Sequence, residues 1–343
     1  MTKPFVPIAF RKEIKQGEKA LTILAADIGG TKTNVALYRA DSGGLNRITQ
    51  KRYVSKDFAS LSAIVHDFAN SKYPDRISAA VAGPVVNGKS KLTNLPWVLD
   101  STSMSKELSI PVSFINDLEA TAYGLAGLNK DQLVTLAAGA PDAKGNMAII
   151  APGTGLGEAG LFWDGQHYHP FATEGGHSDF APRTPKDVKI LYALQQQFGH
   201  VSWERLVSGM GIKNIYQCLV ASNKEQIPEW LSQRMKDDDP AAVISQAALK
   251  HEDLICAETM ELFVRYLATE ASSLVLKLMA TGGLFLAGGI PPKIVPLLQT
   301  ASWTKNFDNN GRMHELSERV PVHVVLNDKM ALQGAAYYGA YNM

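Results

Sequence analysis

Three turns rich in glycine are the first places in this sequence where chemistry is expected, because each follows an apolar stretch typical of a β-strand. Their sequences are D-I-G-G-T (residues 27–31), A-P-G-T-G-L-G (151–157) and L-A-G-G (286–289). Glycine lets the main chain turn tightly and approach a ligand closely, and amides that converge in such a turn bind anions. The turns are therefore candidates for holding the phosphates or the flat ring of a ligand.

A further segment, G-P-V-V-N-G-K-S at residues 83–90, matches the G-x-x-x-x-G-K-S pattern of a phosphate-binding P-loop. A P-loop opens a helix whose first amides hold the phosphate. Here Pro96, with Thr93 and Asn94 shortly before it, leaves little room for that helix. We therefore favour an Asn-Gly hairpin turn at residues 87–88 over a functional P-loop.

The first of the three turns joins two strands rather than a strand and a helix, so it does not fit a dinucleotide-binding loop. Asp27 stands at the end of the first strand. The amides freed by Gly29 and Gly30, together with the hydroxyls of Thr31 and Thr33, are able to form an anion-binding nest. An ordinary hairpin without a ligand is the alternative.

The other two turns repeat parts of this design. Residues 151–157 repeat the order of a strand, a Gly-Thr-Gly turn and a second strand. They lack the spacing of the G-x-G-x-x-G pattern and the helix that follows it. Gly288 and Gly289 end another strand and suit a ring or ribose that approaches the main chain. One such turn is weak support for a ligand site, whereas three in two successive halves of the chain are much stronger.

Two runs of strands and helices must position these turns. In the first run we expect strands at residues 21–26, 34–38, 47–54, 77–82 and 112–115 and helices at 61–69, 104–108 and 118–125. The second run is expected to have strands at 147–151, 158–163, 166–168, 284–287 and 322–326 and helices at 185–198, 211–222, 240–250, 253–279 and 329–341. This order is typical of two related α/β domains. We expect a small lobe at 21–127 plus 326–343, a large lobe at 128–325, and an N-terminal extension at 1–20.

Composition excludes several classes of protein. The 343 residues are 45% apolar, enough for a sizeable core and two domains. Lys and Arg number 34 against 33 Asp and Glu, so the net charge of +1 gives no basic footprint for nucleic acid or an anionic membrane.

The sequence also predicts neither a secretory signal nor a membrane span. Residues 1–20 contain no apolar core of a secretory signal. Several glycines and Lys277 interrupt the apolar stretch 274–292, so we expect no membrane span there. Cys218 and Cys256 are far apart, which fits a reducing cytosol and not a disulfide framework or thiolate zinc site.

Taken together, the motifs resemble the actin-like superfamily of sugar and acetate kinases, chaperone ATPases and actin. Within it the chain is similar to the bacterial hexokinase-type glucokinases from about residue 21 to 338. The remaining motifs that carry the resemblance are L-T-N-L-P-W (92–97), I-N-D (115–117), E-G-G-H-S-D-F-A-P (174–182) and S-W-E-R-L-V-S-G (202–209). Each is weak alone, but the ordered set is highly specific.

One related branch, the ROK repressors and kinases, also carries E-x-G-H, followed there by a cysteine cluster that binds zinc. In this sequence S-D-F-A-P (178–182) follows, and both cysteines lie elsewhere. The resemblance therefore excludes the zinc-bearing branch. The segment before residue 21 is also too short for an added helix-turn-helix.

The resemblance implies two actin-like (ribonuclease H-like) α/β lobes with an active-site cleft between them, and ATP-dependent conversion of glucose to glucose 6-phosphate. Phosphoryl transfer needs positioning, charge neutralisation and a base for the hydroxyl proton. The implied base is Asp117. The alternative is that Asp117 only caps the helix that follows it, since Asn116 and Asp117 are both strong capping types; the N-terminus of that helix would also keep the carboxylate ionised.

The same resemblance implies the binding residues. Glucose contacts are expected from Asn94, Asn116, Asp117, Glu174, His177 and Glu204. ATP contacts are expected from Asp27, Gly29, Gly30, Thr31, Lys32, Gly153, Thr154, Gly155, Gly288 and Gly289. Asp27 would act with Mg²⁺ through water, because Mg²⁺ dehydrates reluctantly. Lys32 either neutralises phosphate charge or is a solvated hairpin lysine.

The resemblance also implies a cytoplasmic homodimer. A broader hexokinase or a polyphosphate-using sugar kinase is the alternative among enzymes. A non-catalytic sugar sensor or an actin-like ATPase switch is the alternative of another class. Asp117 together with Glu174, His177 and Glu204 argues against the last two, because a chaperone or filament needs no sugar cage.

Overall fold

The computed structural model describes residues 5–70, 73–92, 95–223 and 226–343. The chain divides into two compact units. One comprises Met1–Lys130, Trp163–Ala172 and Lys329–Met343, and the other comprises Asp131–Phe162 and Thr173–Asp328. The C-terminal segment therefore belongs to the unit in which the chain begins.

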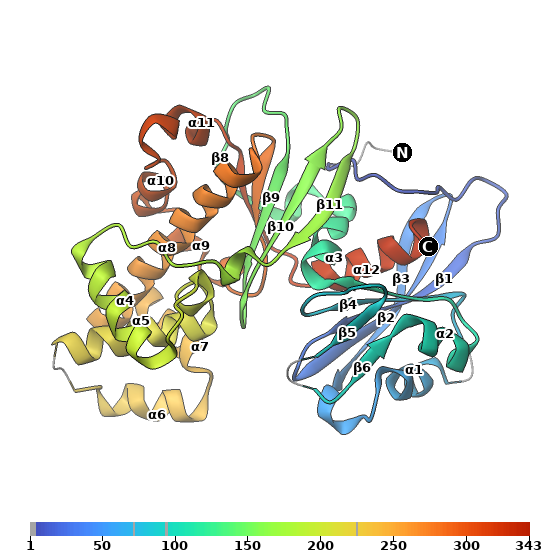
Figure 1. The fold of residues 1–343 in the computed structure, drawn as a ribbon, viewed down its shortest axis with the longest axis horizontal. Coiled ribbons are helices and arrows are strands. Elements are labelled where there is room, and N and C mark those ends of the chain that lie inside the picture. Colours follow the sequence, from blue (N-terminus) through green and yellow to red (C-terminus); the bar gives the residue numbers. More distant parts are fainter. Residues whose placement is uncertain (1–4, 71–72, 93–94, 224–225) are drawn as a thin grey trace. The chain divides into compact units, whose positions relative to one another are not determined.

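The first unit is built on a five-stranded sheet in the order β3-β2-β1-β4-β7 (Figure 1). These strands are β1 (Leu21–Ile28), β2 (Lys32–Asp41), β3 (Gly44–Val54), β4 (Arg76–Val81) and β7 (Val112–Asn116). β1 is antiparallel to β2 and parallel to β4, which is parallel to β7. Ile28, Val81 and Asn116 stand in line across the three parallel strands. The turn after β1 and the residue after β7 therefore lie at the same edge of the sheet.

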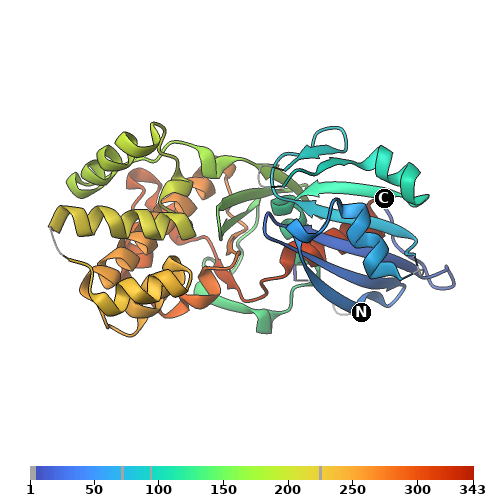
Figure 2. The ribbon, with the colours of Figure 1, turned by 90° about the horizontal axis from the view of Figure 1, so that it is seen from below.

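Helices cover both faces of this sheet, because alternate residues of a strand point to opposite sides. Leu24 packs in one core with α1 (Leu61–Ala69) and α2 (Ser101–Leu108), whereas its neighbour Ile23 packs with α12 (Met330–Tyr341). Figure 2 shows α1 and α2 together on their side of the sheet. α12 also packs against α3 (Asp117–Gly124) so closely that a Cβ atom on Gly334 would lie 1.6 Å from the Ala120 carbonyl oxygen. The remaining short elements of this unit are η1 (Ser55–Asp57), β5 (Lys89–Lys91), β6 (Val98–Asp100) and η2 (Leu125–Gly127). The next element, η3 (Lys130–Gln132), begins with the last residue of the segment Met1–Lys130 and continues into the second unit.

The second sheet has six strands in the order β11-β10-β9-β12-β13-β8. They are β8 (Leu133–Ala137), β9 (Met147–Pro152), β10 (Leu156–Trp163), β11 (Tyr168–Thr173), β12 (Gly283–Leu286) and β13 (Val322–Val325). β9 is antiparallel to β10 and parallel to β12, which is parallel to β13. The order β11-β10-β9-β12-β13 thus repeats that of the first sheet, with β8 added at the edge.

The helices of the second unit share a large core with β8, β9, β10, β12 and β13. α8 (Leu254–Leu278) is the longest, and its Phe263 and Leu267 are fully buried in a cluster with Ile150 and Leu286 of the sheet. The other helical elements are η4 (Gly175–His177), α4 (Pro185–Phe198), η5 (Trp203–Arg205), α5 (Gly209–Asn223), α6 (Glu229–Asp237), α7 (Pro240–Leu249), η6 (Pro291–Lys293), α9 (Val295–Leu298), α10 (Ala301–Phe307), η7 (Gly311–Met313) and α11 (His314–Glu318). Among the described residues, no helix combines the length and the apolarity needed to cross a membrane.

The expected α/β class, with two sheet-containing units, is confirmed. The Asn-Gly turn is also as expected: Asn87 and Gly88 both have positive φ, and Val86 and Lys89 exchange two main-chain hydrogen bonds of 2.9 and 3.0 Å. Lys89 then enters strand β5 rather than a helix, which excludes a P-loop. The sequence did not predict β5, β6, β8, α6 or α9–α11, and it placed the strand at 166–168 slightly before β11.

Candidate active site

The turn between β1 and β2 is held by a buried serine. The Gly29 amide donates to the Lys32 carbonyl at 3.0 Å, the Ser55 hydroxyl donates to the Gly29 carbonyl at 2.9 Å, and the Ser55 amide donates to the Thr31 carbonyl at 3.0 Å. Thr31 and Lys32 are exposed. The expectation for Thr33 is wrong, because its hydroxyl is buried and lies 3.0 Å from that of Ser55. No local pattern marks Ser55, which belongs to no motif and supports the turn from 26 residues away.

Asp27 is the carboxylate nearest this turn. It is the last residue but one of β1, and its Oδ2 accepts a weak hydrogen bond of 3.4 Å from the Asn34 amide on β2. Burial raises the pKa of Asp27, while the Asn34 bond and the charge of Arg52 oppose that rise. A cation bound near Asp27 would offset the cost of its buried charge. Asp27 therefore suits a cation that also takes water and phosphate oxygens. Among the described residues, no group of three or more His, Cys, Asp or Glu side chains is placed to hold a metal ion.

Asp117 begins α3 at the same edge of the sheet. The N-cap is Asn116, whose Oδ1 accepts from the amides of Leu118 at 2.8 Å and Glu119 at 3.2 Å. The Asn116 side-chain amide also donates to the Gly83 carbonyl at 3.1 Å. Asp117 Oδ1 lies 3.0 Å from the Leu118 amide. The interpretation of Asp117 as the N-cap is therefore wrong, and the helix N-terminus favours its ionised form.

The second glycine turn, between β9 and β10, is supported by main-chain contacts. The amide of Gly153 donates to the Gly155 carbonyl, and the amide of Gly209 donates to the Gly153 carbonyl, both at 2.8 Å. Gly288 has φ +83°, and a Cβ atom there would lie 2.6 Å from the Pro152 carbonyl oxygen. The structure thus brings the turn at 288–289 against the end of β9, and the close carbonyl and positive φ require glycine at position 288. Thr154 is exposed, and Gly289 is half-buried.

Glu204 and the turn at 174–177 meet at the beginning of β10. Glu204 Oε2 accepts from the Leu156 amide at 2.9 Å and would lie 2.4 Å from a Cβ atom on Gly155. A Cβ atom on Gly176 would lie 2.2 Å from the Leu156 carbonyl oxygen. Glu174 and His177 remain exposed at this turn. Within the second unit, these three predicted sugar-contacting residues therefore gather beside the predicted phosphate turn.

Asn94, which is expected to contact the sugar, lies outside the described residues.

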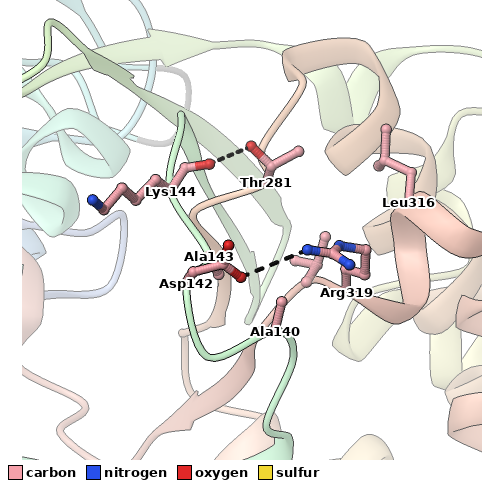
Figure 3. A pocket seen from close by; sticks show the side chains of 8 residues that line it. Ala140, Asp142, Ala143, Lys144, Thr281, Leu316 and Arg319 are labelled. Atoms are coloured by element: carbon pink, nitrogen blue, oxygen red, sulfur yellow. Dashed lines mark hydrogen bonds and ion pairs between the residues drawn. The ribbon is translucent and has the colours of Figure 1, made fainter.

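A cavity of about 200 Å³ is present in the second unit, where Asp142 lies 3.6 Å from Arg319 and the Thr281 hydroxyl donates to the Lys144 carbonyl (Figure 3). Its lining residues precede β9, β12 and β13, at the opposite end of these strands from the glycine turns. Ligands of such sheets bind at the carboxyl ends of the strands, so we assign this cavity no part in the site.

Comparison with known proteins decides the family. The family model described as Glucokinase matches residues 24–342. The chain belongs to the glucokinase family. A curated glucokinase from Nostoc punctiforme is 43% identical over 336 residues, which cover 93% of this chain and 98% of the relative.

Solved structures support the same family and its fold. The crystal structure of a glucokinase from an Antarctic psychrotroph superposes with a TM-score of 0.79 at 34% identity, covering 93% of this chain and 98% of that one. A ROK family glucokinase from Streptomyces griseus, in complex with glucose and AMPPNP, reaches a TM-score of 0.60 at 18% identity, with coverage of 93% and 99%; it supports the fold alone. The resemblance to the hexokinase-type glucokinases is thus confirmed.

Proposed function

We propose that this member of the glucokinase family phosphorylates glucose with ATP and Mg²⁺, that Asp117 is the general base, and that the site residues act as follows. The observation that carries the proposal is the register of the first sheet, which sets Asp117 and the Asp27 turn at one edge of three adjacent strands.

The proposed reaction is an in-line displacement at the γ-phosphorus of ATP. The 6-hydroxyl oxygen of glucose forms a bond to phosphorus as the bond to the ADP oxygen breaks. Asp117 takes the hydroxyl proton during this step. A base must be ionised before it accepts a proton, and the N-terminus of α3 supplies the local field that favours the anion.

Glucose is proposed to be held by hydrogen bonds to its other hydroxyl groups. Glu174 and Glu204 supply carboxylate acceptors, and His177 supplies a ring that donates or accepts. Asn116 still has one amide hydrogen beyond the one it donates to Gly83. We assign Asn94 to the same role on the strength of its motif.

Phosphate binding is proposed to fall to the two glycine turns. Gly29, Gly30, Thr31, Gly153, Thr154 and Gly155 would line the phosphates, with Lys32 as an exposed cation, while Gly288 and Gly289 would border adenosine. The amides of Gly29 and Gly153 already donate within their own turns, so these two glycines would shape the turns and the hydroxyls of Thr31 and Thr154 would donate to the phosphates. When bound, Mg²⁺ neutralises phosphate charge. The fit of Asp27 to a hydrated cation supports its role in holding that ion.

We also propose that the protein acts as a cytoplasmic homodimer. Cys218 and Cys256 are unpaired in the structure, which agrees with a reducing compartment. Sedimentation equilibrium at micromolar concentration tests the dimer, and a mass of one chain would overturn it.

A coupled ADP-release assay tests the donor and acceptor together. It compares glucose, mannose, fructose, N-acetylglucosamine and acetate, each with ATP or polyphosphate as donor. We expect turnover with glucose and ATP that is abolished when Mg²⁺ is chelated. Efficient use of polyphosphate, or equal use of all the hexoses, would instead support the broader sugar kinase; no turnover with any sugar would support a sensor or switch.

A further inference from the structure

Two buried carboxyl groups face each other in the second unit and have no part in the reaction described above. Glu158 of β10 is 1% exposed and Glu270 of α8 is 0% exposed. Glu158 shares its strand face with Leu156, because successive residues alternate between the faces. An ionised carboxylate at such a depth is stable only when it is paired and hydrogen-bonded.

Only one of the two acids has a cationic partner at hydrogen-bonding distance among the described residues. Lys277, half-exposed and two turns further along α8, lies with its Nζ 2.9 Å from Glu270 Oε1. Arg183, the other cation facing this pair, attracts Glu270 from the segment before α4. In the part of the chain that the structure describes, no N–H or O–H group donates to either carboxyl oxygen of Glu158 or to Glu270 Oε2. The carboxyl groups of Glu158 and Glu270 are, however, within hydrogen-bonding reach of each other.

A single proton satisfies this arrangement. If Glu158 is protonated, it donates to the ionised Glu270, whose charge Lys277 balances. Burial, together with the negative charge of Glu270, raises the pKa of Glu158 to about 8. Burial also raises the pKa of Glu270, against the opposing effect of Lys277.

The protonated acid lies directly beneath the turn that carries Glu174 and His177. A Cβ atom on Gly175 would be 2.0 Å from Glu158 Oε2, so the carboxyl group touches the main chain of the turn. Thr173 ties the two together, since its hydroxyl donates to the Glu158 carbonyl at 3.1 Å and accepts from the Gly175 amide at 3.2 Å. The carboxyl group of Glu158 and its main chain therefore both contact the segment at 173–175, which leads into Glu174 and His177.

We propose that Glu158 is a positioning residue for glucose binding, which supports the turn at 174–177 only while it shares a proton with Glu270. This inference rests on the proposed sugar contacts of Glu174 and His177. Loss of the proton leaves two negative charges in the interior beside a single lysine. The exposed turn is the part that can yield to let water reach them, and its displacement moves Glu174 and His177 away from the sugar.

The decisive variant is Glu158→Gln, which keeps the shape of the acid and mimics its protonated form at every pH. We measure KM for glucose and kcat from pH 6.5 to 9.5. In the unmodified protein KM should rise about tenfold from pH 8 to 9.5 while kcat at saturating glucose changes less than twofold. In Glu158→Gln the rise should be absent. Glu261→Gln, an exposed acid on the same helix, is the control and should behave as the unmodified protein does.

A second measurement does not depend on sugar or catalysis. Because the pKa of Glu158 is higher in the folded than in the unfolded chain, its contribution to stability is complete below about pH 4.5 and is lost as the pH rises to about 8. The free energy of unfolding of the unmodified protein should therefore fall over this range relative to that of Glu158→Gln. An equal KM rise in both proteins, parallel stability profiles, or failure of Glu158→Gln to fold would each overturn the inference while leaving the glucokinase reaction intact. Absence of glucose turnover in the unmodified protein at every pH would overturn the proposed function itself.

Discussion

The hairpin turn of β1 and β2 and that of β9 and β10 occupy the same place in two sheets of the same strand order, yet they are supported differently. In the first turn, the buried hydroxyl of Ser55 holds the main chain, and charged side chains at Asp27 and Lys32 flank the glycines. In the second, no charged residue lies within residues 151–157, and the carboxylate of Glu204 holds the Leu156 amide from outside.

The difference indicates a division of labour between the two units. On the proposed roles, the first unit supplies the charges for phosphoryl transfer, through Asp27 and Asp117. The second supplies the acidic and imidazole contacts to glucose, and Glu204 serves both the turn and the proposed glucose site. Changes at Asp27 and Asp117 should therefore act mainly on kcat, and changes at Glu174 and His177 mainly on glucose binding.

The largest effect is expected from Asp117→Asn. Since Asn116 is the N-cap, this substitution leaves the cap intact and should shift the melting temperature by less than about 2 °C. Asn cannot accept the proton, so kcat should fall by roughly 10²–10⁴. Steady-state kinetics and thermal melts measure both. Glu119→Gln in the same helical turn is the control, and its kcat should stay within threefold of the original value.

Next in size is Asp27→Asn, which should lower kcat by roughly 10² because a cation site loses its charge. The same change should stabilise the protein. Burial raises the pKa of Asp27, so Asp27 contributes to the free energy of unfolding while it is protonated. This contribution is lost as the pH rises above the ordinary carboxyl range. In chelator at pH 7 we expect the melting temperature to increase by about 2–4 °C, with no increase at pH 3.5. A lower melting temperature at pH 7 would contradict the description of Asp27 as a carboxylate destabilised by burial.

Glu174→Gln and His177→Ala test the second unit. Each should raise KM for glucose about tenfold or more, because a polar group shaped to a hydroxyl is lost, while KM for ATP stays within twofold. Asp179→Asn in the same exposed segment is the control. An effect on ATP that equals the effect on glucose would remove the distinction between the two units.

The smallest effect is expected from Ser55→Ala. The substitution leaves the Gly29 carbonyl and the Thr33 hydroxyl without their partner, at a cost of about 1–3 kcal/mol in the free energy of unfolding. The looser turn should raise KM for ATP by about twofold to fivefold. Chemical denaturation and ATP titrations measure the two effects, with Ser222→Ala, an exposed helical serine, as the control.

Apolar periodicity in the sequence predicted most of the long elements because it is strong there, as in α8 and β1. It missed β5, β6 and β8, which have three to five residues, and α6, whose short helix is mostly polar. The supports of the site were missed as well. Ser55, Glu158 and the contact of Glu204 with Leu156 depend on segments far apart in the chain, and no local pattern marks them. By contrast, the glycine turns and Asp117 belong to local motifs, so their residue types and spacing are enough to single them out.

Calorimetric titration of glucose into the Asp117→Asn and Glu174→Gln proteins tests the division of labour most directly. We predict that Asp117→Asn binds glucose within about threefold of the original affinity although its turnover is lost, whereas Glu174→Gln binds about tenfold or more weakly. If Asp117→Asn instead loses glucose affinity in proportion to its turnover, and Glu174→Gln binds normally, Asp117 serves to bind the sugar and not as the base, and the proposed roles of Asp117 and Glu174 are wrong.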